Sequence, residues 1–101
     1  METVDYIIGE VKAYEFTIIA NDAPVPVTGA TPTLYVVDNL IELNNILTVV
    51  GTVTDGAAGE ISFSITANNF KAADDYKYRI EIAFTSGDIE ITDWGVWNVN
   101  K

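Results

Sequence analysis

Hydrophobic and polar residues alternate with a period of two along several stretches of this chain. In the stretch that begins at Gly59, serines separate Ile61, Phe63 and Ile65, and in residues 76–85 aromatic and aliphatic residues alternate with charged ones. This period is typical of β-strands with one buried and one solvated face. The pattern predicts seven strands, at residues 4–8, 13–20, 32–38, 46–54, 59–66, 76–85 and 88–99.

Turn residues separate these strands. Asn21-Asp22, Asp55-Gly56 and Ser86-Gly87-Asp88 mark tight connections, residues 39–45 form a hairpin loop, and residues 67–75 form the longest connection. About seven short strands in a chain of 101 residues favour a single all-β domain, 1–101, with an immunoglobulin-like antiparallel β-sandwich fold. A small β-barrel or jelly roll is the alternative architecture.

The last predicted strand changes phase along its length. Ile89 and Ile91 would share a face with Trp97, whereas Trp94 and Val96 would point the other way. A β-bulge near Trp94 would explain the change. Alternatively, the strand is apolar on both faces because one face meets another subunit. In either case we expect Trp97 in the core and Trp94 at a surface or interface.

The connection before strand 76–85 contains a second informative spacing. Phe70 precedes Tyr76 by six residues, and apolar residues alternate after Tyr76. This spacing is typical of the crossover into a late strand of immunoglobulin-like sandwiches, where a tyrosine hydroxyl bonds back to the main chain. Tyr76 is therefore a candidate tyrosine corner, and an ordinary core tyrosine at the start of a strand is the alternative.

The composition leaves little chemistry for a catalytic site. The chain has no histidine and no cysteine, which excludes nucleophile–histidine catalysis and thiolate metal sites. The net charge of −10 opposes binding to nucleic acid or to anionic membranes. No signal peptide begins the sequence, and no run approaches the roughly 20 apolar residues of a membrane span. We expect no enzyme activity and no cofactor.

Acidic residues and glycines are the remaining candidates for a site. The acidic residues gather in the sequence at Asp74-Asp75 and at Asp88, Glu90 and Asp93. A pair of catalytic carboxylates needs a cleft that a domain of this size hardly provides. No calcium-loop motif is present, and the glycines lack the strand-to-helix setting of a phosphate loop.

Three stretches of the sequence carry a resemblance to a known family. They are Tyr6–Glu10 leading into Tyr14–Ile18, Val25–Val36 with its Thr28-Gly29-Ala30-Thr31 turn, and Gly51–Ile65 followed by the strand at Tyr76. Together they resemble the immunoglobulin-like domains of tailed-phage virion proteins, above all the N-terminal domain of phage baseplate upper proteins. The resemblance implies a non-enzymatic structural protein of the virion, assembled in the host cytoplasm, that acts as a tail or baseplate adaptor or as a decoration protein.

Such a protein binds other virion proteins and forms homo-oligomers, so we expect exposed sheet edges to carry its function. Strands 4–8 and 88–99 are the expected edges, and few charges protect the first. The candidate interface residues are Val4, Tyr6, Ile8, Trp94 and Val96. An alternative function is a carbohydrate-binding or adhesive module that uses Trp94 and nearby tyrosines. A bacterial surface domain is a third interpretation.

Overall fold

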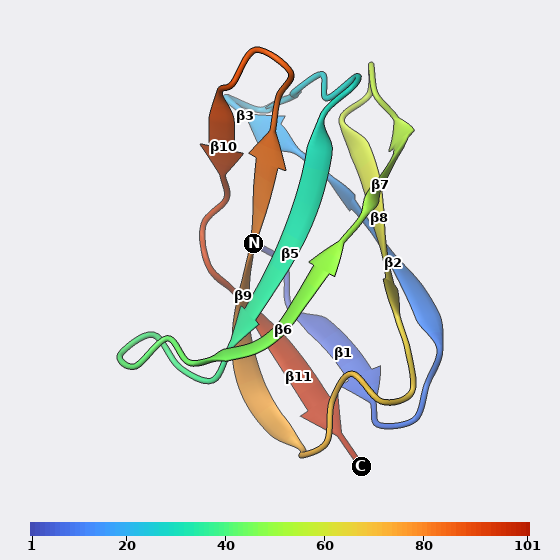
Figure 1. The fold of residues 1–101 in the computed structure, drawn as a ribbon, viewed down its shortest axis with the longest axis vertical. Coiled ribbons are helices and arrows are strands. Elements are labelled where there is room, and N and C mark those ends of the chain that lie inside the picture. The colour runs from blue at the N-terminus through green and yellow to red at the C-terminus, as the bar shows by residue number, and fades with distance from the viewer.

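The computed structural model describes residues 1–101 and contains strands but no helix (Figure 1). The prediction of an all-β fold is therefore confirmed. The strands are β1 (Val4–Ile7), β2 (Lys12–Thr17), β3 (Ile19–Ala20), β4 (Ala23–Pro24), β5 (Thr31–Val37), β6 (Asn45–Val50), β7 (Thr52–Asp55), β8 (Glu60–Ile65), β9 (Asp74–Ala83), β10 (Ile89–Ile91) and β11 (Gly95–Asn100).

Two sheets face each other across the core. The larger has the order β1-β11-β9-β5-β6, with β10 also paired to β9, and the smaller has the order β2-β8-β7. β3 and β4 form a separate short hairpin. Most neighbouring strands are antiparallel, but β1 runs parallel to β11, with Val4 opposite Trp97. The expectation of a wholly antiparallel arrangement is wrong at this strand.

Three of the predicted strands are divided in two by the structure. Strand 13–20 becomes β2 and β3, strand 46–54 becomes β6 and β7, and strand 88–99 becomes β10 and β11. The division of 46–54 lies at Gly51, where the chain passes from the larger sheet to the smaller one. A Cβ atom at Gly51 would lie 2.5 Å from the carbonyl oxygen of Ser62 and 2.6 Å from the ring of Phe63.

The division of strand 88–99 contains the predicted bulge. Ile91 pairs with Glu81 and Gly95 pairs with Tyr78, so four steps along this strand oppose three steps along β9. The extra residue changes the phase, as a β-bulge does. Ile89 and Ile91 consequently do not share the inward face of Trp97. They lie on the outer face of the sheet and are 60% and 51% exposed.

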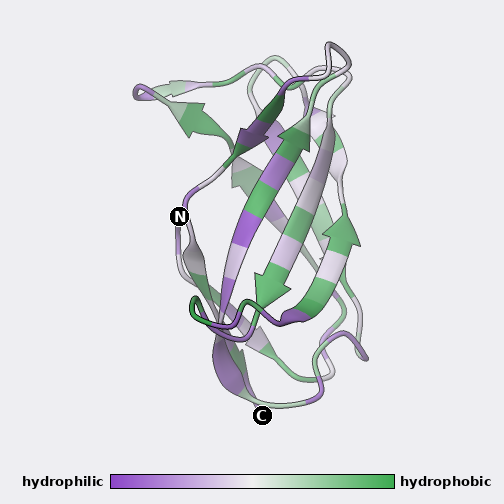
Figure 2. Ribbon diagram, turned by 60° about the vertical axis from the view of Figure 1, so that its left-hand side comes forward, coloured by the Kyte–Doolittle hydropathy of each residue, from purple (hydrophilic) through white to green (hydrophobic).

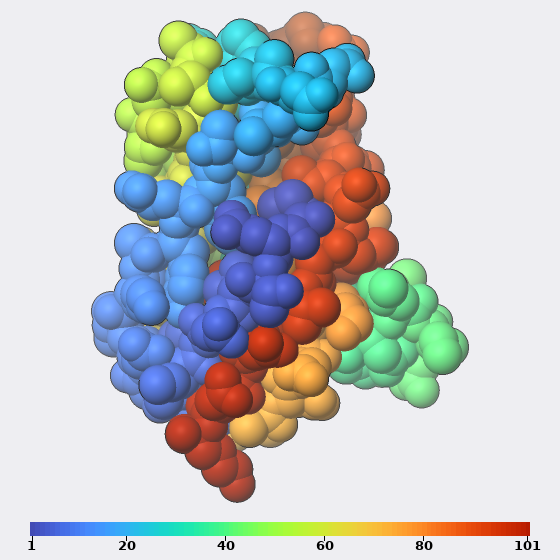
Figure 3. Space-filling view, turned by 180° about the vertical axis from the view of Figure 1, so that it is seen from behind, coloured from blue at the N-terminus to red at the C-terminus, as the bar shows by residue number.

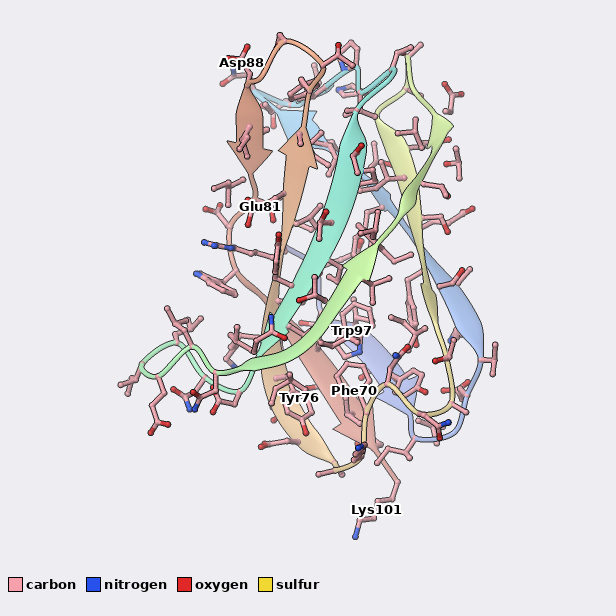
Figure 4. The ribbon with its side chains drawn as sticks, in the orientation of Figure 1. Phe70, Tyr76, Glu81, Asp88, Trp97 and Lys101 are labelled. Carbon is pink, nitrogen blue, oxygen red and sulfur yellow. The ribbon has the colours of Figure 1, made fainter.

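The core is one cluster of nineteen buried residues. Within it, aromatic rings gather around Trp97. Trp97 is fully buried, as predicted, and its ring centroid lies 5.3 Å from that of Tyr78 and 6.1 Å from that of Phe70. Figure 4 shows Phe70, Tyr76 and Trp97 gathered between the sheets. Figure 2 shows hydrophobic and hydrophilic residues alternating along the strands of the larger sheet, which is the period-two pattern of the sequence.

Candidate assembly interface

The acidic residues do not gather into one cluster. No group of three or more Asp or Glu side chains is placed to hold a metal ion. No charged side chain is buried, so no carboxylate has the burial that tunes catalytic acids. The structure contains no helix long and apolar enough to cross a membrane.

Two of the five candidate interface residues lie inside the core. The side chains of Val4 and Tyr6 are 6% and 0% exposed, and Ile8 is half-buried against the same cluster. Their burial follows from the pairing of β1 with β11, which turns alternate residues of β1 inward. The side chains of Val4 and Tyr6 are therefore unavailable to a partner.

The free edge of β1 is protected by the chain itself, contrary to expectation. The N–H of Ile7 donates to Oε1 of Glu10 at 2.8 Å, and its carbonyl accepts from the N–H of Glu10 at 3.0 Å. The hydroxyl of Tyr14 donates to the carbonyl of Asp5 at 2.9 Å. These bonds satisfy main-chain groups that an incoming strand would need. The prediction that strand 88–99 forms a second edge is wrong in part. β11 lies between β1 and β9, and only β10 remains open.

Trp94 and Val96 are half-buried on the outer side of the larger sheet. The guanidinium of Arg79 lies over the ring of Trp94, 5.0 Å from its centroid, and Arg79 also forms a loose ion pair with Glu81 at 3.7 Å. This face remains accessible to a protein partner. One face of the Trp94 ring, however, is already occupied by a cation.

Tyr76 has the geometry expected of a tyrosine corner. Its hydroxyl donates to the carbonyl of Ala72, four residues upstream, at 2.8 Å, and its ring centroid lies 5.4 Å from that of Phe70. Burial raises the pKa of the Tyr76 hydroxyl, and the charge of Asp74 adds to the effect. The hydroxyl therefore stays protonated as a donor that holds the connection 66–73 against the sandwich.

The loop of residues 38–44 is a surface that sequence reasoning missed. Five of the eleven exposed large hydrophobic side chains of the protein fall between residues 40 and 50, and they are Leu40, Ile41, Leu43, Ile46 and Val50. Ile41 is 93% exposed. Figure 3 shows this segment, in green, projecting from the body of the molecule. The available signal was three large aliphatic residues in a turn, where polar residues are usual.

Polar side chains at its base hold this apolar loop in one shape. Oδ1 of Asp38 accepts the N–H groups of Asn39 and Asn44 at 2.7 and 3.0 Å. Oδ1 of Asn39 accepts the N–H groups of Ile41 and Glu42 at 3.0 and 2.8 Å. The hydrogen bond from the Asn44 side chain, together with the main-chain N–H groups of Asn39 and Asn44, lowers the pKa of Asp38. The loop thus presents its aliphatic side chains from an ordered frame.

Comparison with known families agrees with this structural picture. Residues 9–93 match the family model described as the BppU N-terminal domain. The chain belongs to this family. The resemblance to the N-terminal domain of phage baseplate upper proteins is thereby confirmed, and the protein is a structural component of the phage virion that interacts with other virion proteins. Comparison with curated proteins gives no match.

The region matched by the BppU N-terminal domain model is shorter than the packed structure. It contains the 38–44 loop and β6 but leaves out all of β1 and all of β11. The loop is thus within the family region, whereas part of the core lies outside it.

Proposed function

We propose that this BppU N-terminal domain is a baseplate adaptor that joins virion proteins through protein contacts and catalyses no reaction. The observation that carries the proposal is the ordered 38–44 loop, with Leu40, Ile41 and Leu43 exposed at 48%, 93% and 49%. Clustered exposed apolar side chains on a soluble domain mark interaction sites. The family supports the baseplate setting.

The energetics of the loop suit a docking element. Burying one large aliphatic side chain contributes roughly 1.5–3 kcal/mol. A loop already held by Asp38 and Asn39 loses little conformational entropy on binding, so more of that contribution remains as affinity. The expected partner is a baseplate protein with an apolar pocket that accepts the tip at Ile41.

We further infer that the sandwich is an elaborated immunoglobulin-like fold. The division of three expected strands, together with the short strand β4 that was not expected, explains why eleven strands are present where seven were predicted. The hydrogen bond from Tyr76 to Ala72 and the position of Trp97 in the core support this interpretation.

The test is a binding experiment with the other baseplate proteins of the same phage, using Ile41→Asp. A charge at the tip should weaken binding at least about thirtyfold, the size of a hot-spot loss of about 2 kcal/mol. Val11→Asp is the matched control, because Val11 is also highly exposed, at 77%, but lies outside the loop. Equal affinities for the two variants, measured by isothermal titration calorimetry, would refute a role for the loop.

The carbohydrate-binding alternative has less support. A stacking platform needs an open aromatic face, and Arg79 covers one face of Trp94. A glycan array that gave strong, Trp94-dependent binding would reverse this preference.

A further inference from the structure

The edge of β6 lacks the protection that the edges at β1, β2 and β10 carry. Residues 43–54, from Leu43 through β6 and most of β7, contain no charged residue and no proline. Natural sheet edges are normally protected by charges, prolines or covering groups. β2 carries Lys12 and Glu15, β10 carries Glu90 at its centre, and the main chain of β1 is covered by the side chains of Glu10 and Tyr14.

The main-chain groups of β6 are partly unused. The N–H of Gly51 donates to the carbonyl of Pro32 at 2.9 Å, and Val49 lies opposite Leu34 in the same register. Because bonding directions alternate along an antiparallel pair, Val49 bonds toward β5 while Thr48 and Val50 direct their N–H and carbonyl groups away from it. β6 has no other neighbouring strand. Val50 is also 67% exposed.

We propose that two copies of this chain pair through β6, antiparallel, across a two-fold axis near Val49. Thr48 of each copy then lies opposite Val50 of the other. The outward N–H and carbonyl groups of these residues can form four hydrogen bonds, two in each Thr48–Val50 pair. The β-branched side chains form favourable cross-strand pairs. The larger sheet becomes continuous across the two copies. This inference deepens the proposed adaptor function and rests on it.

The absence of charge on β6 favours a second copy of this chain as the partner at this edge. An uncharged strand can meet itself without repulsion, even though each chain carries a net charge of −10. The same two-fold pairing at β10 would set Glu90 opposite Glu90 of the other copy, and like charges directly opposite destabilise a strand pair. β6 is therefore the edge suited to self-pairing.

The neighbouring loop enlarges the contact beyond the strand itself. An antiparallel arrangement brings the 38–44 loop of each copy toward the Val50 end of β6 in the other. A stable interface usually buries about 800 Å² on each partner, more than a short strand edge supplies. Exposed side chains at Leu43, Ile46 and Val50 are available to make up the difference.

Light scattering of the full chain over a range of concentrations tests the proposal. The mass should rise from 11.0 kDa toward twice that value, and hydrogen exchange at the Thr48 amide should slow at high concentration. Val50→Pro removes an N–H that does not bond to β5, and should weaken pairing at least about tenfold, since each copy loses one donor. Val50→Thr keeps the N–H and the branched shape, and should pair as the parent does.

A constant mass of 11.0 kDa up to millimolar concentration would overturn the proposal, as would unchanged pairing in Val50→Pro. Slowed exchange at Ile89 and Ile91 instead of Thr48 would assign the contact to β10. Should Val50→Pro not fold, mixing Val50→Glu with Thr48→Lys decides. A mixture that pairs more tightly than either variant alone supports the stated register, and a mixture that does not pair contradicts it.

The two proposals fail in different ways. A monomeric parent chain whose binding to other baseplate proteins is still lost in Ile41→Asp would refute the β6 pairing alone. A dimer whose partner binding is unaffected by Ile41→Asp would refute the role of the loop alone.

Discussion

Tyrosine hydroxyls connect the core of this domain to its surface main chain. Four of the five tyrosines donate to carbonyl oxygens, namely Tyr6 to Glu10, Tyr14 to Asp5, Tyr76 to Ala72 and Tyr78 to Glu2. Their rings pack in the interior while the hydroxyls reach the rim, which is the combination for which tyrosine is suited. Burial is the main cause that raises the pKa of each hydroxyl, to about 12 for Tyr14.

Removal of one such hydroxyl tests its contribution at the residue scale. Tyr76→Phe deletes the donor to Ala72 and leaves that carbonyl without this partner, so the free energy of unfolding should fall by about 1 kcal/mol. Urea unfolding followed by circular dichroism measures the change. Tyr35→Phe is the control, because Tyr35 is half-exposed and its hydroxyl has no hydrogen bond within the chain. Equal stability of the two variants would contradict a structural role for the Tyr76 hydroxyl.

At the scale of elements, one residue allows the chain to serve both sheets. β6 belongs to the larger sheet and β7 to the smaller, and Gly51 alone separates them. The main chain of β8 and the ring of Phe63 approach Gly51 so closely that a side chain has no space there. The absence of a Cβ atom thus permits the strand to change sheets.

Gly51→Ala should destabilise the domain by about 1–3 kcal/mol, because the added methyl group meets Ser62 and Phe63 in a packed region. Gly87→Ala is a useful comparison. Gly87 has a φ of 98° but no neighbouring atom within 4 Å, so alanine there costs about 1 kcal/mol of backbone strain only. Thermal unfolding of both variants measures the difference. A smaller loss for Gly51→Ala than for Gly87→Ala would show that β8 moves away easily.

At the scale of the whole molecule, the two ends of the chain close the sandwich together. β1 and β11 are neighbours in the larger sheet, and they contribute Val4, Tyr6, Trp97 and Val99 to the core cluster. The family region at 9–93 contains none of these four residues. We therefore propose that residues 1–101 fold as one unit.

A fragment of residues 9–93 tests this unit. It lacks the fully buried Trp97 and Tyr6, and loss of large buried aromatic residues costs roughly 3–5 kcal/mol each, comparable with the whole stability of a small domain. The fragment should show no cooperative thermal transition and poorly dispersed amide resonances, whereas the 1–101 chain should show both a transition and dispersion. A cooperatively folded fragment would refute the proposal.

The all-β class, the burial of Trp97 and the phase change before Val96 were all predicted from the sequence, and the spacing from Phe70 made Tyr76 a candidate tyrosine corner. Each of these follows from period-two alternation or from a local spacing, which record which side of a strand is buried. Three features came instead from the three-dimensional arrangement of the strands: β1 runs parallel to β11, Glu10 and Tyr14 cover the β1 edge, and the β6 edge stays open. Strand neighbours are joined by main-chain groups that are the same in nearly every residue, so side-chain patterns specify the buried face but not the partner across the ladder.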